Sequence, residues 1–486
     1  MASYTTDIVQ SLPFSEILVG QELILGLGCP LCVANEQNVK FCFTINIGEN
    51  FLGGTVIGTF KTTPNNAAVG LLDISTILES YVAADNMATS DSQYKIQGNN
   101  GQEVPIHLID EYSRSKNTVR SLTVSGYTEF TNSSGEIVQT NAVTVMIGFL
   151  INGYVKYSDT LKSVFATTYG DGFGFSFSLE DYAIVTGSTG KFLSNSPSIQ
   201  YARAEDYGTM GFLALSQFPN SSGDTFTPDV AKYKIERFNA DGSSQGSEYV
   251  DRTDYNGAFS GSVNVGNNMQ NRILYIAAFP ANLRVDSTFN TVLENGTLDS
   301  YEITLLNSSD AAISETKRVY ILCPNLKEYK PIRLTWLNQF GTWDYYTFNQ
   351  KSVKSISTKG TTYQQLGGSW NSRTYTPYGF KGGKKTFRVN ASEKIKINTG
   401  YITEEHTDWF EELVNSPEIY MLKDWELPRQ QTSVAVPTTE RKALSNEVIP
   451  VTLTTKTFTK KTVANDKLIQ YTFEVEKSRN LRTQSI

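Results

Sequence analysis

Short runs of β-branched and aromatic residues, separated by turn residues, recur along most of this chain. Residues 41–47 and 56–62 alternate apolar and polar side chains, which is the two-residue period of a strand with one buried face. Residues 122–130 and 137–150 flank Asn-Ser-Ser-Gly, a pattern that predicts a β-hairpin. Helix-favouring Ala, Leu and Glu do not dominate the composition. We therefore predict a mainly β, multidomain protein of sandwich-like or barrel-like units, with about two isolated α-helices.

Two segments depart from the strand period. Residues 71–84 predict a helix, because apolar residues recur at spacings of three and four, namely at Leu71, Ile74, Ile77, Leu78, Tyr81 and Val82. Residues 404–414 predict a second helix, with Thr403 as N-cap and acidic residues in the first turn. Residues 85–103 are polar and predict a long loop, whereas residues 171–179 alternate phenylalanine with small residues and predict a strand.

The length of 486 residues corresponds to about three average domains. We place an N-terminal β-rich domain with one helix at residues 1–203, a middle β domain at 204–325, and a C-terminal β-rich domain at 326–486 that holds the second helix. The middle domain contains two strong turn signals, Asn-Ala-Asp-Gly from Asn239 and Asn-Ser-Ser-Asp from Asn307. Strands at residues 448–457 and 468–476 close the chain.

The formal net charge is −7 and the estimated pI is about 5.2. Such a surface repels phosphate backbones, which argues against sequence-specific nucleic-acid binding. The C-terminus departs from this average and is locally basic through Lys456, Lys460, Lys461, Lys467, Lys477, Arg479 and Arg482. A solvated strand face explains this run, and docking onto an acidic neighbouring subunit is the functional alternative.

The first residues lack the basic start and apolar run of a signal peptide. Residues 18–31 are apolar but short and rich in glycine, so they do not predict a membrane span. We therefore expect synthesis in a cytoplasm and no stable membrane insertion.

Four cysteines are present: Cys29 and Cys32 in a C-x-x-C, then Cys42 and Cys323. A redox motif requires a strand that leads into a helix, whereas the residues after Cys32 suggest a turn. A zinc site requires a fourth ligand near Cys42, for which Cys323 is the remaining candidate. We expect structural thiols and no cofactor, and metal binding by Cys29, Cys32 and Cys42 stays open as the alternative.

Catalytic motifs are weak. His107 and His406 are the only histidines, and we expect both to be structural. Residues 379–386 approach a P-loop, but Lys384 replaces a required glycine and a strand-like run follows; at residues 187–191 the next residue is Phe192 rather than Ser or Thr. A glycosidase pair would need two carboxyl groups in a cleft, with Asp344 opposite Glu404, Glu405 or Asp408. Acidic residues are too common to discriminate, so we predict no enzyme activity.

The densest aromatic cluster is the sequence R-L-T-W-L-N-Q-F-G-T-W-D-Y-Y-T-F at residues 333–348. Such clusters mark ligand platforms, binding surfaces or subunit seams. Strand alternation sends Trp343 and Tyr345 to one face and Tyr346 and Phe348 to the other. The cluster is then either a strand buried on both sides or a platform that stacks on sugar rings. The candidates for packing or an interface are Trp336, Trp343, Tyr345, Tyr346, Phe348, Trp409 and Trp425.

Several islands of the chain carry a family resemblance. Cys-Pro-Asn-Leu-Lys-Glu-Tyr at 323–329, Ile-Arg-Leu-Thr-Trp-Leu-Asn at 332–338 and the segment 340–348 resemble a pattern in tail proteins of tailed double-stranded-DNA bacteriophages, especially Bacteroidetes and crAss-like phages. Further similar islands are residues 58–64 with 72–82, residues 407–422, and residues 449–456 with 465–476.

This resemblance implies a structural virion component made in the host cytoplasm. It would act in the tail as a ring, hub, baseplate or adaptor, as a homo-oligomer that contacts other tail proteins. No catalytic residue carries over. The alternative is a glycan-binding adhesin at the tail tip, which requires Trp343 and Tyr345 to be exposed and would make a host surface glycan the partner. A polysaccharide depolymerase ranks third.

Overall fold

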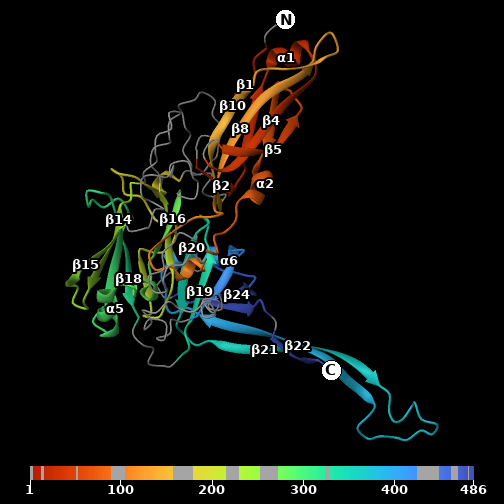
Figure 1. The fold of residues 1–486 in the computed structure, drawn as a ribbon, viewed down its shortest axis with the longest axis vertical. Coiled ribbons are helices and arrows are strands. Elements are labelled where there is room, and N and C mark those ends of the chain that lie inside the picture. Colours follow the sequence, from red (N-terminus) through yellow and green to blue (C-terminus); the bar gives the residue numbers. More distant parts are fainter. Residues whose placement is uncertain are drawn as a thin grey trace. The chain divides into compact units, whose positions relative to one another are not determined.

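The computed structural model describes residues 4–12, 16–50, 53–88, 104–156, 179–214, 229–251, 272–322, 329–423, 448–460, 469–479 and 481–485. Its strands form five sheets, so the prediction of a mainly β protein is confirmed (Figure 1). None of the sheets in these residues closes into a barrel.

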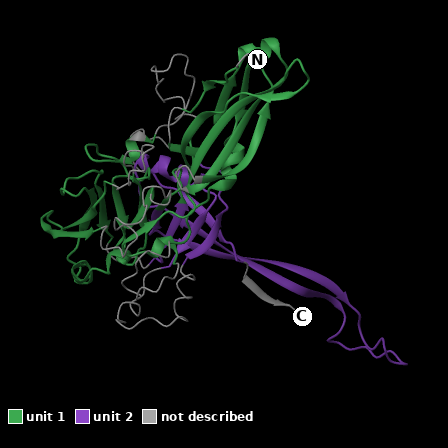
Figure 2. Ribbon diagram, turned by 45° about the horizontal axis from the view of Figure 1, so that its top comes forward, with its two compact units in different colours: residues 1–322, 337–344, 424–445 green, residues 323–336, 345–423, 446–486 purple. Residues whose placement is uncertain are grey.

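Contacts divide the chain into two compact units (Figure 2). Unit 1 comprises Met1–Leu322, Leu337–Asp344 and Asp424–Ser445, and unit 2 comprises Cys323–Trp336, Tyr345–Lys423 and Asn446–Ile486. The sequence predicts three consecutive domains instead. Composition gives no signal that strands on both sides of residue 203 share sheets, nor that one hairpin belongs to both units.

The first part of unit 1 is a pair of facing sheets. The smaller sheet has the order β1-β3-β6, with β1 at Asp7–Gln10, β3 at Ile24–Gly28 and β6 at Val69–Asp73. The larger sheet has the order β2-β10-β8-β4-β5, with β9 paired to β8. Its strands are β2 (Glu16–Gly20), β4 (Gln37–Asn50), β5 (Gly53–Thr62), β8 (Val119–Thr131), β9 (Ile137–Gln139) and β10 (Val143–Tyr154). The predicted strands at 41–47 and 56–62 and the predicted hairpin are confirmed.

The core between these two sheets follows from the alternation. Leu25 and Leu27 of β3 are fully buried with Phe41, Phe43 and Ile45 of β4 in one cluster. Each such side chain contributes roughly 1.5–3 kcal/mol relative to an exposed position.

The second part of unit 1 pairs a four-stranded with a five-stranded sheet. The first has the order β11-β13-β16-β7 and the second the order β12-β18-β17-β14-β15. The strands are β7 (Tyr112–Arg114), β11 (Ala183–Ile184), β12 (Ile199–Ala202), β13 (Thr209–Ala214), β14 (Lys232–Phe238), β15 (Ser244–Asp251), β16 (Ile273–Ala277), β17 (Ser300–Leu306) and β18 (Lys317–Ile321). Tyr112 of β7 joins the two sheets: its ring lies edge-on to that of Tyr233 at 5.2 Å, and its hydroxyl donates to the Val250 carbonyl at 3.0 Å.

Both turn signals of the middle region are confirmed. Gly242 adopts a φ of +82° between β14 and β15, and Asp310 adopts a φ of +62° in the turn after β17. Asn307 holds the second turn, because its Oδ1 accepts from the amides of Ser309 and Ala311 at 2.9 Å each.

Unit 2 contains one eight-stranded sheet, with the order β20-β19-β23-β24-β25-β22-β21 and β26 paired to β22. Its strands are β19 (Ile332–Leu337), β20 (Trp343–Phe348), β21 (Val353–Gln365), β22 (Gly383–Asn398), β23 (Ile419–Leu422), β24 (Val448–Leu453), β25 (Thr472–Lys477) and β26 (Leu481–Ser485). Helix α6 (Glu404–Asn415) begins after Thr403 as predicted, and its Trp409, Phe410 and Leu413 enter the core. The two strands predicted near the C-terminus correspond to β24 and β25.

The predicted helix at 71–84 is mostly wrong. Leu71 and Leu72 lie in β6 and pair with Gly26 and Leu25 of β3, because the sheet ladder outweighs the local period. Helix α2 covers only Ser75–Leu78, and a 3-10 turn follows at Glu79–Tyr81.

Among the described residues, three further α-helices have no counterpart in the sequence prediction: α1 (Pro30–Asn35), α4 (Pro280–Leu283) and α5 (Ser287–Glu294). Most of the predicted loop at 85–103 and of the predicted strand at 171–179 lies outside the described residues. Across the described chain, no helix is both long and apolar enough to cross a membrane.

Candidate functional site

The aromatic motif forms a hairpin of β19 and β20. The chain passes from unit 2 into unit 1 after Trp336 and returns to unit 2 at Tyr345. The tip of the hairpin therefore belongs to unit 1, and its two strand stems belong to unit 2.

Within unit 1 the tip is held by the buried side chain of Asn338. Its Oδ1 accepts from the amides of Phe340 and Thr342 at 3.0 and 3.1 Å, which closes the turn. Its Nδ2 donates to the carbonyl of Leu193 at 2.8 Å, and the Thr342 hydroxyl donates to the same carbonyl at 2.6 Å. The turn is thus fixed both internally and to a segment 145 residues earlier in the chain.

Two glycines allow this close approach. Gly341 has a φ of +75°, and a Cβ there would lie 1.7 Å from the carbonyl oxygen of Asn152. A Cβ on Gly153 would lie 2.5 Å from the carbonyl oxygen of Gln339. Neither position has room for a side chain.

Trp343 is buried beside the tip, with 2% of its surface exposed. Its indole Nε1 donates to the backbone carbonyl of Asp85 at 2.8 Å, and its ring meets that of His107 edge-on at 4.8 Å. The Asp85 carboxylate is itself fully buried and accepts from Thr118 Oγ1 and the Asn117 amide, both at 2.6 Å. Burial raises the pKa of Asp85, and these hydrogen bonds oppose the rise.

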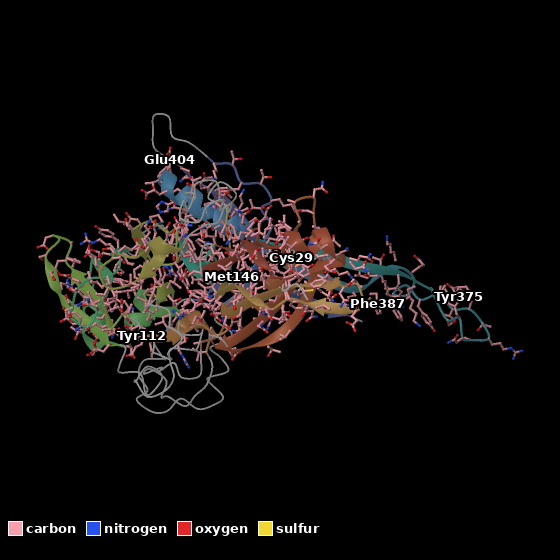
Figure 3. The ribbon with its side chains drawn as sticks, turned by 90° about the horizontal axis from the view of Figure 1, so that it is seen from above. Cys29, Tyr112, Met146, Tyr375, Phe387 and Glu404 are labelled. Atoms are coloured by element: carbon pink, nitrogen blue, oxygen red, sulfur yellow. A yellow bond between two sulfur atoms is a disulfide. The ribbon has the colours of Figure 1, made fainter. Side chains whose placement is uncertain are left out.

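Asp344 cannot serve as a glycosidase carboxyl in this arrangement. It is 3% exposed, and its Oδ1 accepts from Ser194 Oγ at 2.6 Å and from Asn338 Nδ2 at 3.2 Å. A substrate cannot reach a carboxylate that is covered and hydrogen-bonded in this way. Glu404 is exposed at the start of α6 (Figure 3). Glu405, the next residue, is exposed as well.

The stems form the aromatic core of unit 2. The ring centroids of Trp336 and Trp409 are 5.0 Å apart, and the ring of Tyr346 lies edge-on to that of Phe410 with centroids 4.9 Å apart. The ring centroids of Phe348 and of Phe473 in β25 are 5.9 Å apart. Trp336, Phe348 and Trp409 are buried and Tyr346 is half-buried, so they form a core between the sheet and α6.

Tyr345 is buried on the other face of β20. The guanidinium of Arg333 lies 5.3 Å from its ring centroid and donates to Thr347 Oγ1 at 2.8 Å. Both Arg333 and Tyr345 are at most 3% exposed.

The motif is therefore a buried strand pair and not a sugar platform. The platform requires Trp343 and Tyr345 to be exposed, which the structure contradicts. Trp336, Trp343, Tyr345, Tyr346, Phe348 and Trp409 are covered by their own chain, so they pack the interior. Trp425 lies outside the described residues.

The cysteine prediction needs a correction. Cys29 and Cys32 form a disulfide rather than two thiols, and the motif does lie between a strand, β3, and a helix, α1. Pro30 at the first helical position starts the helix that sequence reasoning took for a turn. Both cysteines are buried, at 2% and 0% exposure, which shields the bond from exchange with other thiols.

Cys42 is a buried thiol whose pKa is raised mainly by burial. Cys323 lies outside the described residues. Within the described ranges, no group of three or more His, Cys, Asp and Glu side chains could hold a metal ion.

The two histidines occupy packed positions. His107 is buried in a 3-10 turn, Ile106–Leu108, rather than in the strand-like run seen in the sequence. His406 Nδ1 lies 2.9 Å from Thr403 Oγ1 at the start of α6, and burial lowers its pKa. The strand-like run that follows the P-loop-like residues 379–386 lies in β22, so the prediction of a strand there is confirmed.

Two lysines of the basic C-terminal run form ion pairs with other described residues. Lys460 lies 2.7 Å from Asp408 and 2.9 Å from Glu411 of α6, and Lys477 lies 3.1 Å from Glu393. This favours the interpretation of a solvated strand face. Lys461 and Lys467 lie outside the described residues.

Sequence reasoning missed the long hairpin of β21 and β22, which we call the arm (residues 353–398). Every residue of β21 is exposed except Gln365, which is half-buried. Trp370 and Phe380 at its tip are 63% and 73% exposed, and Figure 3 shows Tyr375 and Phe387 along it. A signal was present in the sequence: residues 353–398 contain nine Lys and Arg against one acidic residue, Glu393.

No family model matches this chain, and no curated protein matches it. Among solved structures, a similarity was found to the partial N-terminal region of an enterococcal surface protein, at 10% identity, covering 66% of this chain and 94% of that chain. The TM-score is 0.13, which carries no argument about fold or function.

Proposed function

We propose that this chain is a structural component of a bacteriophage tail, which acts by homo-oligomeric assembly and by contacts with other tail proteins. The resemblance of the islands around residues 323–348 to phage tail proteins is the starting point. The observation that carries the proposal is the arm, which leaves apolar and basic side chains of a β-rich chain uncovered for a neighbour.

Composition of purified virions tests this proposal. Particles of the encoding phage should contain this chain at a copy number that matches a ring or other symmetric part of the tail, by quantitative mass spectrometry. Labelling with an antibody against the chain should place it on the tail in electron micrographs. A chain that is abundant in the infected host but missing from purified virions would refute the proposal.

The alternative of a glycan-binding adhesin no longer has its predicted platform, because Trp343 and Tyr345 are buried. The depolymerase alternative likewise loses Asp344 as a candidate carboxyl. No observation in the described chain favours either function over the structural role.

A further inference from the structure

The arm has no supporting layer in the described chain. β21 pairs with β22 along its full length and lies at the edge of the sheet. β22 pairs with β25 only over Lys394–Asn398 and with β26 only over Arg388–Ala391. Outside these spans the arm is a two-stranded ribbon, and such a ribbon is marginally stable on its own in water.

The arm also exposes much apolar surface. Ile356 is 62% exposed, Leu366 and Trp370 are 63% exposed, and Phe387 is 51% exposed. Tyr363 and Phe387 meet edge-on across the two strands, with ring centroids 6.5 Å apart, so two exposed aromatic rings lie together on the arm. Exposed aromatic and aliphatic residues gathered on one element mark a binding surface.

Charge is the second feature of the arm. Its nine cations and one Glu give a net charge of +8, in a chain whose total is −7. The ion pairs that residues of the arm form with other described residues lie near the base of the arm, where Lys394 lies 3.4 Å from Glu474 and Glu393 pairs with Lys477. Seven other cations of the arm form no ion pair with a described residue; they are Lys354, Lys359, Arg373, Lys381, Lys384, Lys385 and Arg388.

The complementary charge is in unit 1 of the same sequence. Unit 1 contains 21 Lys and Arg against 37 Asp and Glu, a net charge of −16. Unit 2 contains 21 against 12, a net charge of +9, of which the arm supplies +8. Each copy of the chain therefore carries both a basic arm and an acidic unit.

We infer that the arm docks on the acidic surface of unit 1 of a second copy of this chain. The arm provides the apolar anchors Trp370, Phe380 and Phe387, and its lysines meet carboxylates of the partner copy. The arm and its acceptor are different surfaces, so the contact is heterologous, and its repetition closes a ring or continues as a filament.

A nucleic acid is the competing partner for a basic aromatic hairpin. Two observations disfavour it. Seven of the nine cations are lysines, whereas arginine is the residue enriched at phosphate contacts. Ile356 and Leu366 are aliphatic, and they gain nothing from a phosphate backbone.

The inference deepens the proposed function and rests on it for its biological setting. The association itself is a property of the purified full-length chain. We would measure it by sedimentation velocity and mass photometry at low and at high salt. The wild type should form assemblies larger than one chain, and high salt should weaken them.

Two arm variants test the two contributions. Trp370→Ala and the double variant Lys384→Glu with Lys385→Glu should each weaken association by about tenfold or more, because they remove an anchor or reverse the charge. The matched controls are Tyr401→Ala, which removes an aromatic side chain that is 67% exposed outside the arm, and Lys423→Glu with Lys456→Glu, which reverses two exposed charges outside it. Both controls should associate like the wild type.

A photo-crosslinking residue in place of Trp370 identifies the acceptor. The experiment uses a mixture of isotopically light and heavy chains, in which a cross-link between two copies joins one light and one heavy peptide. These mixed cross-links should join the arm of one copy to a peptide from unit 1 of the other. A monomeric wild type, or arm variants and controls with equal association, would overturn the inference. So would a monomeric wild type that binds duplex DNA or anionic vesicles through the arm. Virion composition is measured in a separate experiment. The proposed tail function can therefore be refuted while self-association through the arm is confirmed, and self-association can be refuted while the chain is found in virions.

Discussion

At the scale of single residues, Asn338 organises the tip of the aromatic hairpin. Its carboxamide accepts from two backbone amides of its own turn and donates to Leu193, Thr342 and Asp344. All of these groups are buried, so water cannot replace a lost partner.

We predict that Asn338→Ala lowers the free energy of unfolding by about 2–4 kcal/mol, because several buried polar groups lose their partner at once. Chemical denaturation measures the loss. Asn132→Ala is the matched control: Asn132 Oδ1 accepts from the amides two and four residues ahead in the same way, but at an exposed turn. The control should lose less than about 1 kcal/mol, and equal losses in both variants would contradict this account.

Glu248 of β15 provides a pH-dependent contribution to stability. Its side chain faces Arg237 of β14 at 3.2 Å and the carboxyl of Asp286, the N-cap of α5. Burial and then Asp286 raise the pKa of Glu248 to about 7, whereas Arg237 lowers it. Burial and the neighbouring Asp286 carboxyl group favour the protonated form of Glu248, so the folded state holds a proton there.

The folded state therefore binds more protons than the unfolded state between the ordinary pKa of Glu248 and about 7. Stability should fall by roughly 1–3 kcal/mol as the pH rises through this window. Glu248→Gln should flatten that part of the profile, and Glu22→Gln, an exposed control, should keep it. Denaturation midpoints at a series of pH values provide the measurement, and an unchanged slope in Glu248→Gln would exclude this group.

At the scale of elements, the Cys29–Cys32 disulfide fixes the passage from β3 into α1. We predict that a denatured, unreduced sample leaves both cysteines unlabelled by a thiol reagent, and that prior reduction adds two labelled positions, Cys29 and Cys32, in peptide mass spectra. Replacing both with alanine should cost about 2 kcal/mol for so short a loop. Labelling of Cys29 or Cys32 without reduction would contradict the bond.

The elements show where sequence reasoning succeeds. Alternation places β4, β5 and β8 correctly, and Thr403 with Glu404 and Glu405 marks the start of α6. Sequence reasoning fails where pairing with a strand that is distant in the sequence determines the structure. Leu71 and Leu72 have helical spacing, but they lie in β6 and pair with β3. The candidate site follows the same rule, because the aromatic residues are visible in the sequence but the segment around Leu193 that covers the hairpin tip is not.

At the scale of the whole molecule, the two units have separate cores and opposite net charges. Trp409 belongs to the core of unit 2, where it contacts Trp336 and Phe410.

We predict that Trp409→Ala destabilises unit 2 by about 3–5 kcal/mol. Hydrogen exchange followed by mass spectrometry should show faster exchange in peptides of β19, β23 and β25, while β3 and β4 of unit 1 keep their protection. Faster exchange of equal size in both units would show that they unfold as one cooperative body.

Gly341 and Gly153 have a consequence for how this chain can vary over evolution. A Cβ at either position meets a backbone carbonyl, so no neighbouring substitution of a side chain can make room for it. We therefore expect selection to remove substitutions at these two glycines, whereas substitutions on the exposed strands should be tolerated. Homologues too divergent to align over their whole length should still share a glycine near the end of β10, and an Asn-x-x-Gly-Thr turn between two aromatic strands.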